Sequence, residues 1–156
     1  MRFHFDFISP YAYLAWTQIH AIAARHGRPV EPVPVLFAAL LKHWGHKGPA
    51  EIPPKRRYVG KDIRRNAALL GQPICPPPEH PFNPLLALRV AGLEMSPQTR
   101  SLLVNSLFGA TWASGEGVTD PTIVARIANG CGVPDAVERA NRPEGKDALR
   151  RATDVA

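Results

Sequence analysis

Near its start the chain carries Arg2-Phe3-His4-Phe5-Asp6-Phe7-Ile8-Ser9-Pro10-Tyr11, and this stretch decides the fold. Phe3, Phe5 and Phe7 occupy every second position of this stretch, which is the period-2 pattern of a half-buried strand. Ser9 is a favourable residue before a helix, and Pro10 suits the first helical position, where a missing N–H is no loss. The stretch therefore predicts a strand that runs directly into a helix, with a hydroxyl at the junction.

The following residues extend this pattern to a second strand. Apolar residues recur at helical spacing from Tyr11 to His26, and Gly27 is a typical helix stop. Arg28 to Val35 is rich in valine but holds three prolines, so we expect a short strand or an edge strand. Strand, helix and strand within about 35 residues predict a right-handed βαβ unit with parallel strands, and therefore an α/β fold.

The middle and end of the chain predict helices and no further strand. The segment from Gln72 to Pro84 holds six prolines, which excludes regular structure. Its length is typical of a functional loop or of one wall of a site. The predicted helices are Leu36 to Trp44, Lys55 to Leu70, Pro84 to Leu93, Pro97 to Trp112, one that begins at Pro121 and ends at Gly130 or Gly132, and one that Pro134 opens.

A net charge of +6 favours an anionic partner without identifying it. Basic residues gather in Lys55-Arg56-Arg57, Lys61 and Arg64-Arg65. A solvated helix face is the commonest role of such a run, and a few of the cations could attract carboxylates of a ligand. No nucleic-acid-binding motif accompanies the cluster, so we expect no nucleic-acid partner.

The composition, 45% hydrophobic and 21% charged, is typical of a soluble globular protein. No apolar run has the length of a membrane span, and residues 1–6 do not resemble a signal peptide. Cys75 and Cys131 lie far apart and form no CxxC pattern, so we expect reduced thiols. The six histidines show no metal-ligand spacing, and no metal is expected. Together these features predict a cytoplasmic protein without membrane contact.

Phe5-Asp6-Phe7-Ile8-Ser9-Pro10-Tyr11-Ala12-Tyr13-Leu14-Ala15 closely resembles the opening of 2-hydroxychromene-2-carboxylate isomerases and of kappa-class glutathione transferases. Both families belong to the DsbA-like branch of the thioredoxin fold. Further segments resemble family landmarks in the same order, namely Gly48-Pro49-Ala50-Glu51-Ile52-Pro53-Pro54-Lys55, Gly71-Gln72-Pro73, Phe82-Asn83-Pro84 and Phe108-Gly109-Ala110-Thr111-Trp112. The resemblance therefore spans most of the chain.

This resemblance implies a DsbA-like thioredoxin fold with a helical insertion. Residues 1–36 would form the N-terminal βαβ part, residues 37–132 the helical insertion, and residues 133–156 the start of the return to the thioredoxin-like part. The family's C-terminal β-hairpin and last helix have no counterpart among these residues, so we expect them to be missing from this chain.

The resemblance implies that Ser9 contacts the sulfur of glutathione and stabilises its thiolate. A serine at a helix N-terminus faces unpaired N–H groups and the positive end of the helix dipole, which suits an anion. A simple helix cap is the alternative reading of the same residue. Ser9-Pro10-Tyr11-Ala12 contains no cysteine, so dithiol exchange is largely excluded.

Further glutathione- or substrate-binding residues are implied with their own alternatives. Pro10 and Tyr11 directly follow Ser9, although Tyr11 could equally pack as a core aromatic. Lys55 resembles a ligand-reaching lysine or is a surface residue, and Lys42 lies near a substrate-contacting lysine of the isomerases. Asn83 lies in the proline-rich loop, where asparagine otherwise makes turns. The sixth candidate, Glu51, replaces a family asparagine, and its carboxylate would repel an anionic ligand.

The resemblance implies a glutathione-dependent isomerase that converts 2-hydroxychromene-2-carboxylate to trans-o-hydroxybenzylidenepyruvate in the breakdown of aromatic hydrocarbons. It also implies glutathione as cofactor, an aromatic carboxylate as substrate and a homodimer. Two alternatives stay open: a kappa-like glutathione transferase or peroxidase, and a catalytically silent thioredoxin-like binding domain.

Overall fold

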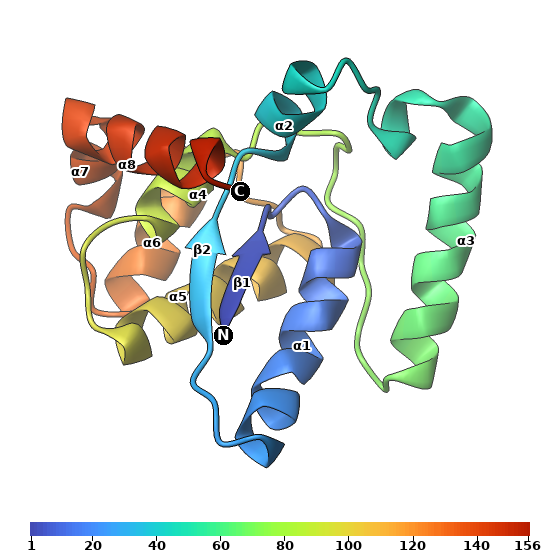
Figure 1. Ribbon diagram of the computed structural model, residues 1–156, viewed down its shortest axis with the longest axis horizontal. Coiled ribbons are helices and arrows are strands. Elements are labelled where there is room, and N and C mark those ends of the chain that lie inside the picture. Colours follow the sequence, from blue (N-terminus) through green and yellow to red (C-terminus); the bar gives the residue numbers. More distant parts are fainter.

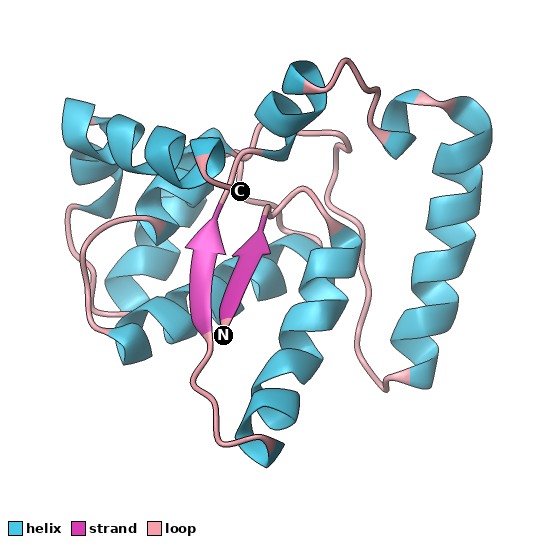
Figure 2. Cartoon of the chain, in the orientation of Figure 1, coloured by secondary structure: helices cyan, strands magenta, loops and turns pink.

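The computed structural model describes residues 1–156 and contains a small parallel sheet surrounded by helices (Figures 1 and 2). Strand β1 (Arg2–Phe5) pairs in parallel with β2 (Glu31–Pro34), and helix α1 (Pro10–Arg25) connects them. Residue 2 lies opposite residue 31, and residue 5 lies opposite residue 34. The βαβ unit predicted from the sequence is therefore confirmed.

Strand β1 is shorter than its alternating pattern predicts, because the chain turns after Phe5. The main-chain N–H of Ser9 donates to the carbonyl of Asp6 at 3.1 Å, and the Ile8 N–H donates to the Asp6 side chain at 3.0 Å. These local bonds replace strand pairing over residues 6–8. Phe7 keeps the inward direction of the alternation and is completely buried.

Strand β2 tolerates its prolines because of its register. The Glu31 N–H donates to the carbonyl of Met1, directly before β1, and the Val35 N–H donates to the carbonyl of Phe5, both at 2.9 Å. The backbone N–H groups of the odd-numbered residues therefore point towards β1. Pro32 and Pro34 occupy even-numbered positions, where no N–H is needed for pairing with β1. The two-stranded sheet leaves β2 at an edge, as its prolines predict.

The remaining elements are helical. Most helix boundaries lie within two residues of the prediction, and two segments differ further. The helix expected to reach residue 112 becomes π-helical after Phe108, and the segment after Pro134 forms two helices because Pro143 opens a new one. Residues 72–84 form neither helix nor strand, as predicted. The elements are α2 (Phe37–His43), the 3₁₀ turn η1 (Pro49–Glu51), α3 (Pro53–Leu69), α4 (Leu85–Ala91), α5 (Pro97–Phe108), the π-helical turn η2 (Gly109–Ala113), α6 (Pro121–Gly130), α7 (Ala136–Asn141) and α8 (Pro143–Asp154).

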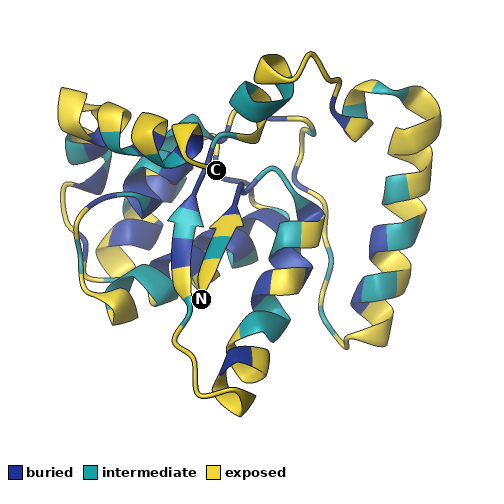
Figure 3. Cartoon of the chain, in the orientation of Figure 1, coloured by how far each residue is buried: buried dark blue, intermediate teal, exposed yellow.

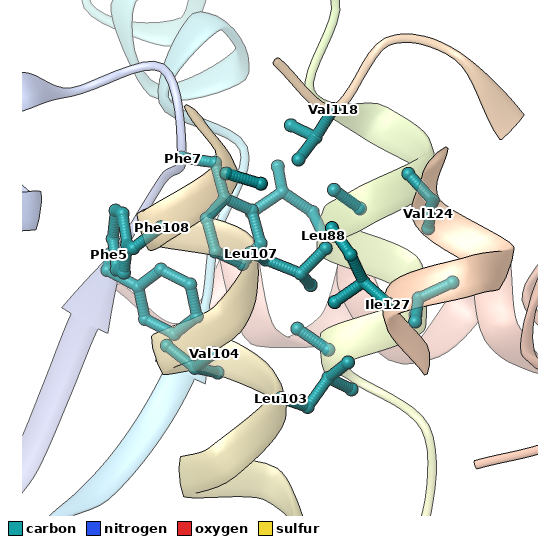
Figure 4. Packing of buried hydrophobic residues seen from close by; sticks show 14 of the residues in the cluster. Phe5, Phe7, Leu88, Leu103, Val104, Leu107, Phe108, Val118, Val124 and Ile127 are labelled. Atoms are coloured by element: carbon teal, nitrogen blue, oxygen red, sulfur yellow. The ribbon is translucent and has the colours of Figure 1, made fainter. Parts of the chain in front are cut away.

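The hydrophobic core lies between the sheet and helices α4, α5 and α6 (Figure 4). The ring of Phe108 packs edge-on against Phe7, with centroids 4.8 Å apart, and lies 5.4 Å from Phe5. Leu88, Val104 and other fully buried side chains complete this core. In Figure 3 the buried residues of α4, α5 and α6 lie on the sides of these helices that face the core.

Helix α3 contributes little to that core. Only Ile63 and Ala67 are buried on it, and it packs beside α1 on the side away from α4 to α8 (Figure 1). Its largely exposed surface carries the basic cluster. No helix of the protein combines the length and the apolar character needed to cross a membrane.

Candidate functional site

A cavity of about 740 Å³ lies at the N-terminal end of α1. One wall comes from α1 and α2, the opposite wall from α3, and a third from the proline-rich loop 72–84. The lining is mainly apolar, with a few charged and polar groups. Such a mixture is typical of small-molecule sites, where apolar walls bind and a few polar groups orient the ligand.

Ser9 lies on the wall of this cavity. As the residue before α1, it is half-buried and its Oγ accepts a hydrogen bond from the Ala12 N–H at 3.2 Å. Pro10 has no N–H, and the Tyr11 N–H has no acceptor within the helix because the residue four positions earlier lies outside it. A hydroxyl, a first-turn amide and the positive end of the helix dipole therefore meet at the cavity.

Asp6 fixes the turn that presents Ser9. Its side chain is 4% exposed, and its two oxygens accept separate hydrogen bonds: Oδ1 from the Ile8 N–H at 3.0 Å and Oδ2 from the Phe37 N–H at 2.9 Å. The second bond ties the turn to the first residue of α2. Burial raises the pKa of Asp6 to about 6, against the two backbone bonds, which lower it.

Two aromatic side chains hold the same turn from distant segments. Trp112, from η2, donates its indole N–H to the Phe7 carbonyl at 2.8 Å. His80, from the proline-rich loop, places Nε2 3.1 Å from the Ile8 carbonyl, and its ring packs edge-on against Trp112 with centroids 5.4 Å apart. Desolvation lowers the pKa of His80, the Ile8 hydrogen bond opposes this effect, and the Arg56 charge adds to the lowering.

Tyr11 links two walls of the cavity. Its hydroxyl donates to Asp62 on α3 at 2.7 Å, while its ring is 40% exposed and lines the cavity. Partial burial and the neighbouring carboxylate raise the pKa of Tyr11 to about 12. The phenol is therefore a hydrogen-bonded wall group that keeps its proton at neutral pH.

The structure brings together only some of the residues predicted for the site. Ser9, Pro10, Tyr11 and Glu51 line the cavity. The Glu51 side chain accepts a hydrogen bond from the Gly48 N–H at 2.7 Å, which holds its carboxylate in the η1 turn.

The other three predicted residues do not line the cavity. Lys42 and Lys55 are exposed on α2 and α3. Asn83 is exposed as well, and its side chain accepts from the Leu85 N–H at 3.0 Å. This contact is the turn interaction that the sequence offered as the alternative for asparagine.

Positive charge reaches the cavity from two arginines of the basic cluster. Arg56 and Arg64 both line it, eight residues apart on α3 and therefore on similar faces of the helix. Arg56 also donates to the His80 carbonyl at 3.3 Å, which connects α3 to the proline-rich loop. No cluster of three His, Cys, Asp or Glu side chains suited to a metal ion occurs in the structure.

The architecture and this site define a thioredoxin-like protein with a serine directly before α1, on the wall of a cavity. A family model of the DsbA-like thioredoxin domain matches residues 1–156, and the chain belongs to that family. A solved structure of a 2-hydroxychromene-2-carboxylate isomerase has the same fold: it superposes with a TM-score of 0.90 at 22% identity, over 99% of this chain and 77% of that chain.

Curated relatives include both enzyme classes that the motif resembles. Kappa 2 glutathione S-transferase of Caenorhabditis elegans is 27% identical over 167 residues, 100% of this chain and 74% of the relative. The 2-hydroxychromene-2-carboxylate isomerase of Pseudomonas putida is 29% identical over 119 residues, 74% of this chain and 56% of the relative. Kappa 1 glutathione S-transferase of Caenorhabditis elegans is 31% identical over 77 residues, 49% of this chain and only 34% of the relative.

Proposed function

We propose that the protein is a glutathione-dependent isomerase that converts 2-hydroxychromene-2-carboxylate to trans-o-hydroxybenzylidenepyruvate. The observation that carries this proposal is the Ser9 hydroxyl, presented at the N-terminus of α1 on the wall of a 740 Å³ cavity. A cavity of this size is within the range that encloses small organic ligands. The kinship with isomerases and glutathione transferases supports the same class of chemistry.

In this mechanism glutathione binds with its sulfur against Ser9 and the Tyr11 N–H. The Ser9 oxygen already accepts from the Ala12 N–H, so its own hydrogen is free to point at the sulfur. These donors and the helix dipole favour a negative charge on sulfur and lower the pKa of the thiol. Ser9 acts as an anion stabiliser and does not itself attack the substrate.

The thiolate then adds to the carbon–carbon double bond of the ring-opened substrate. Addition converts the double bond to a single bond, rotation about that bond follows, and expulsion of the thiolate restores the double bond in the trans arrangement. Arg56 and Arg64, which line the cavity, are the proposed partners for carboxylates of glutathione or of the substrate.

Further parts of the proposal concern binding and assembly. Pro10, Tyr11 and Glu51 are proposed to contact glutathione or the substrate from the cavity wall, while Lys42, Lys55 and Asn83 would act from outside it. We also propose that residues 37–132 form an insertion between two segments of the thioredoxin-like part, residues 1–36 and 133–156. A cytoplasmic location and a homodimer are proposed as well.

The decisive experiment follows the ultraviolet spectrum of 2-hydroxychromene-2-carboxylate with and without glutathione, for the wild type and for Ser9→Ala. Conversion should need glutathione, and the variant should lose about 100-fold in kcat/KM because one donor to the sulfur is removed. Ser96→Ala is the matched control, since Ser96 caps α5 in the same way, accepting from the Thr99 N–H at 3.1 Å. Near-normal turnover by Ser9→Ala would refute the role of its hydroxyl.

A kappa-like glutathione transferase or peroxidase is the second candidate. The alignment with a kappa-class transferase over the whole chain favours it. Mass spectrometry of the products separates the two candidates, because a transferase releases a glutathione conjugate, a peroxidase yields oxidised glutathione, and an isomerase returns glutathione unchanged. A wild-type protein that binds no glutathione would instead support a silent binding domain.

A further inference from the structure

The proposed reaction begins with a thiol that must lose its proton, and the inference here rests on that proposed function. The donors around Ser9 stabilise a thiolate but cannot accept a proton from the thiol. Ser9 and the Tyr11 N–H act as donors to sulfur. The proton must pass either to water or to an acceptor of the protein, and an acceptor on the cavity wall would act as a general base.

Most titratable side chains of the cavity are unsuited to this task. Both oxygens of Asp6 are engaged by backbone N–H groups deep in the turn. The Glu51 carboxylate accepts from the Gly48 N–H through Oε1 and belongs to the η1 turn, not to the turn that carries Ser9. Tyr11 donates its own proton to a carboxylate. Arginine has no acceptor, which excludes Arg56 and Arg64.

His80 differs from all of these groups. A peptide carbonyl can only accept a hydrogen bond, so the 3.1 Å contact with the Ile8 carbonyl requires the proton on Nε2. The Nδ1 lone pair of this tautomer makes no hydrogen bond with the protein. The ring is half-buried on the cavity wall, beside the residue that precedes Ser9.

We propose that His80 is the catalytic base that deprotonates glutathione. The S–H bond of the thiol breaks, its electron pair stays on sulfur, and the proton forms a new N–H bond at Nδ1. The products of this step are a thiolate against Ser9 and an imidazolium that still donates from Nε2 to the Ile8 carbonyl. When glutathione leaves, the proton returns from Nδ1 to sulfur, so the step is balanced and needs no other reactant.

The surroundings suit a ring that is neutral at rest and charged only in the complex. Burial and the nearby Arg56 guanidinium disfavour a positive charge on the His80 ring of the free protein, and together they outweigh the Ile8 hydrogen bond, which favours it. A thiolate in the cavity reverses this balance, because its negative charge attracts the imidazolium. The aromatic contact with Trp112 and the bond to the Ile8 carbonyl keep the ring in place through both states.

Nitrogen-15 NMR of histidine-labelled protein tests the proposal directly at neutral pH. Glutathione should convert the His80 signals from a neutral to a protonated ring, whereas S-methylglutathione, which has no thiol proton, should leave them neutral. Comparison with His80→Gln, or with His80→Asn if that variant does not fold, assigns the signals. A His80 ring that stays neutral while bound glutathione absorbs as a thiolate would overturn the proposal and leave the proposed function intact.

Kinetics provide the second test. His80→Gln should lower kcat/KM for the isomerisation by about 100-fold, the usual contribution of a general base. His26→Gln is the matched control, because His26 is exposed at the far end of α1 and does not line the cavity. Equal activity of the two variants would overturn the proposal. A wild type that binds no glutathione would overturn the proposed function and this inference together.

Discussion

Replacing Asp6 by asparagine should change the pH dependence of stability in a defined direction. Asp6 is almost fully buried, and its pKa rises from an ordinary 3.8 to about 6 in the folded protein. Between these values the folded state binds more protons than the unfolded chain. The contribution of this group to the free energy of unfolding is therefore complete below about pH 4 and falls as the pH rises towards 6.

The magnitude follows from the rise in pKa, which corresponds to about 3 kcal/mol of lost stability between about pH 4 and pH 7. An asparagine side chain at this position would carry no charge and would escape this loss. Its single acceptor oxygen replaces two carboxylate oxygens, so the N–H of Ile8 or of Phe37 loses its partner, at a cost of about 1–3 kcal/mol at every pH. The variant should be less stable than the wild type at about pH 4 and equal or superior to it at about pH 7.

Urea unfolding followed by tryptophan fluorescence at several pH values measures this difference, since Trp16 and Trp112 are both buried. Asp147→Asn, which removes an exposed carboxylate on α8, is the matched control. If the stability difference between Asp6→Asn and the wild type is independent of pH, or grows in favour of the wild type as pH rises, the reasoning about the buried carboxylate is wrong.

Three further changes test packing around the site by urea unfolding. Phe108→Ala should cost about 3–5 kcal/mol because its ring is wholly buried, whereas Leu102→Ala on the exposed face of the same helix should cost little. Equal losses for the pair would contradict the position of the core. Gly115→Ala should destabilise, since its φ is +73° and an added Cβ would meet the Cys75 sulfur at 2.6 Å; unchanged stability would refute this crowding. Trp112→Phe should cost about 1–3 kcal/mol, because a buried main-chain carbonyl loses its 2.8 Å hydrogen bond, and a loss confined to a few tenths would contradict it.

The sequence predicted the elements whose signals are local. Ser9, Ser96 and Asp120 each stand directly before a proline, and each accepts a hydrogen bond from the first turn of the helix that follows. Cap and proline together mark a helix start within a few residues, so tertiary context was not needed to place it. The βαβ unit was predictable for the same reason, because its strands and helix are consecutive.

The supporting side chains of the site carried no such signal. Asp6 contacts a residue 31 positions away, His80 one 72 positions away and Trp112 one 105 positions away. His80 was visible in the sequence only as one of six histidines without metal spacing. The sequence also did not indicate which cations of α3 line the cavity, because the rotation of that helix against α1 decides that Arg56 and Arg64 do so, and a charged cluster does not specify a rotation.

The turn before Ser9 sets a condition on when the site can exist during synthesis. Its main-chain groups are held by Trp112 and His80 as well as by Asp6, so the βαβ unit contains the serine but not all of the partners that fix it. A nascent chain emerging from the ribosome would carry the motif long before Trp112 is available to bind the turn. The local bonds of the turn can form early, but the full set of contacts that fixes the serine is complete only late in translation, after Trp112 has been made.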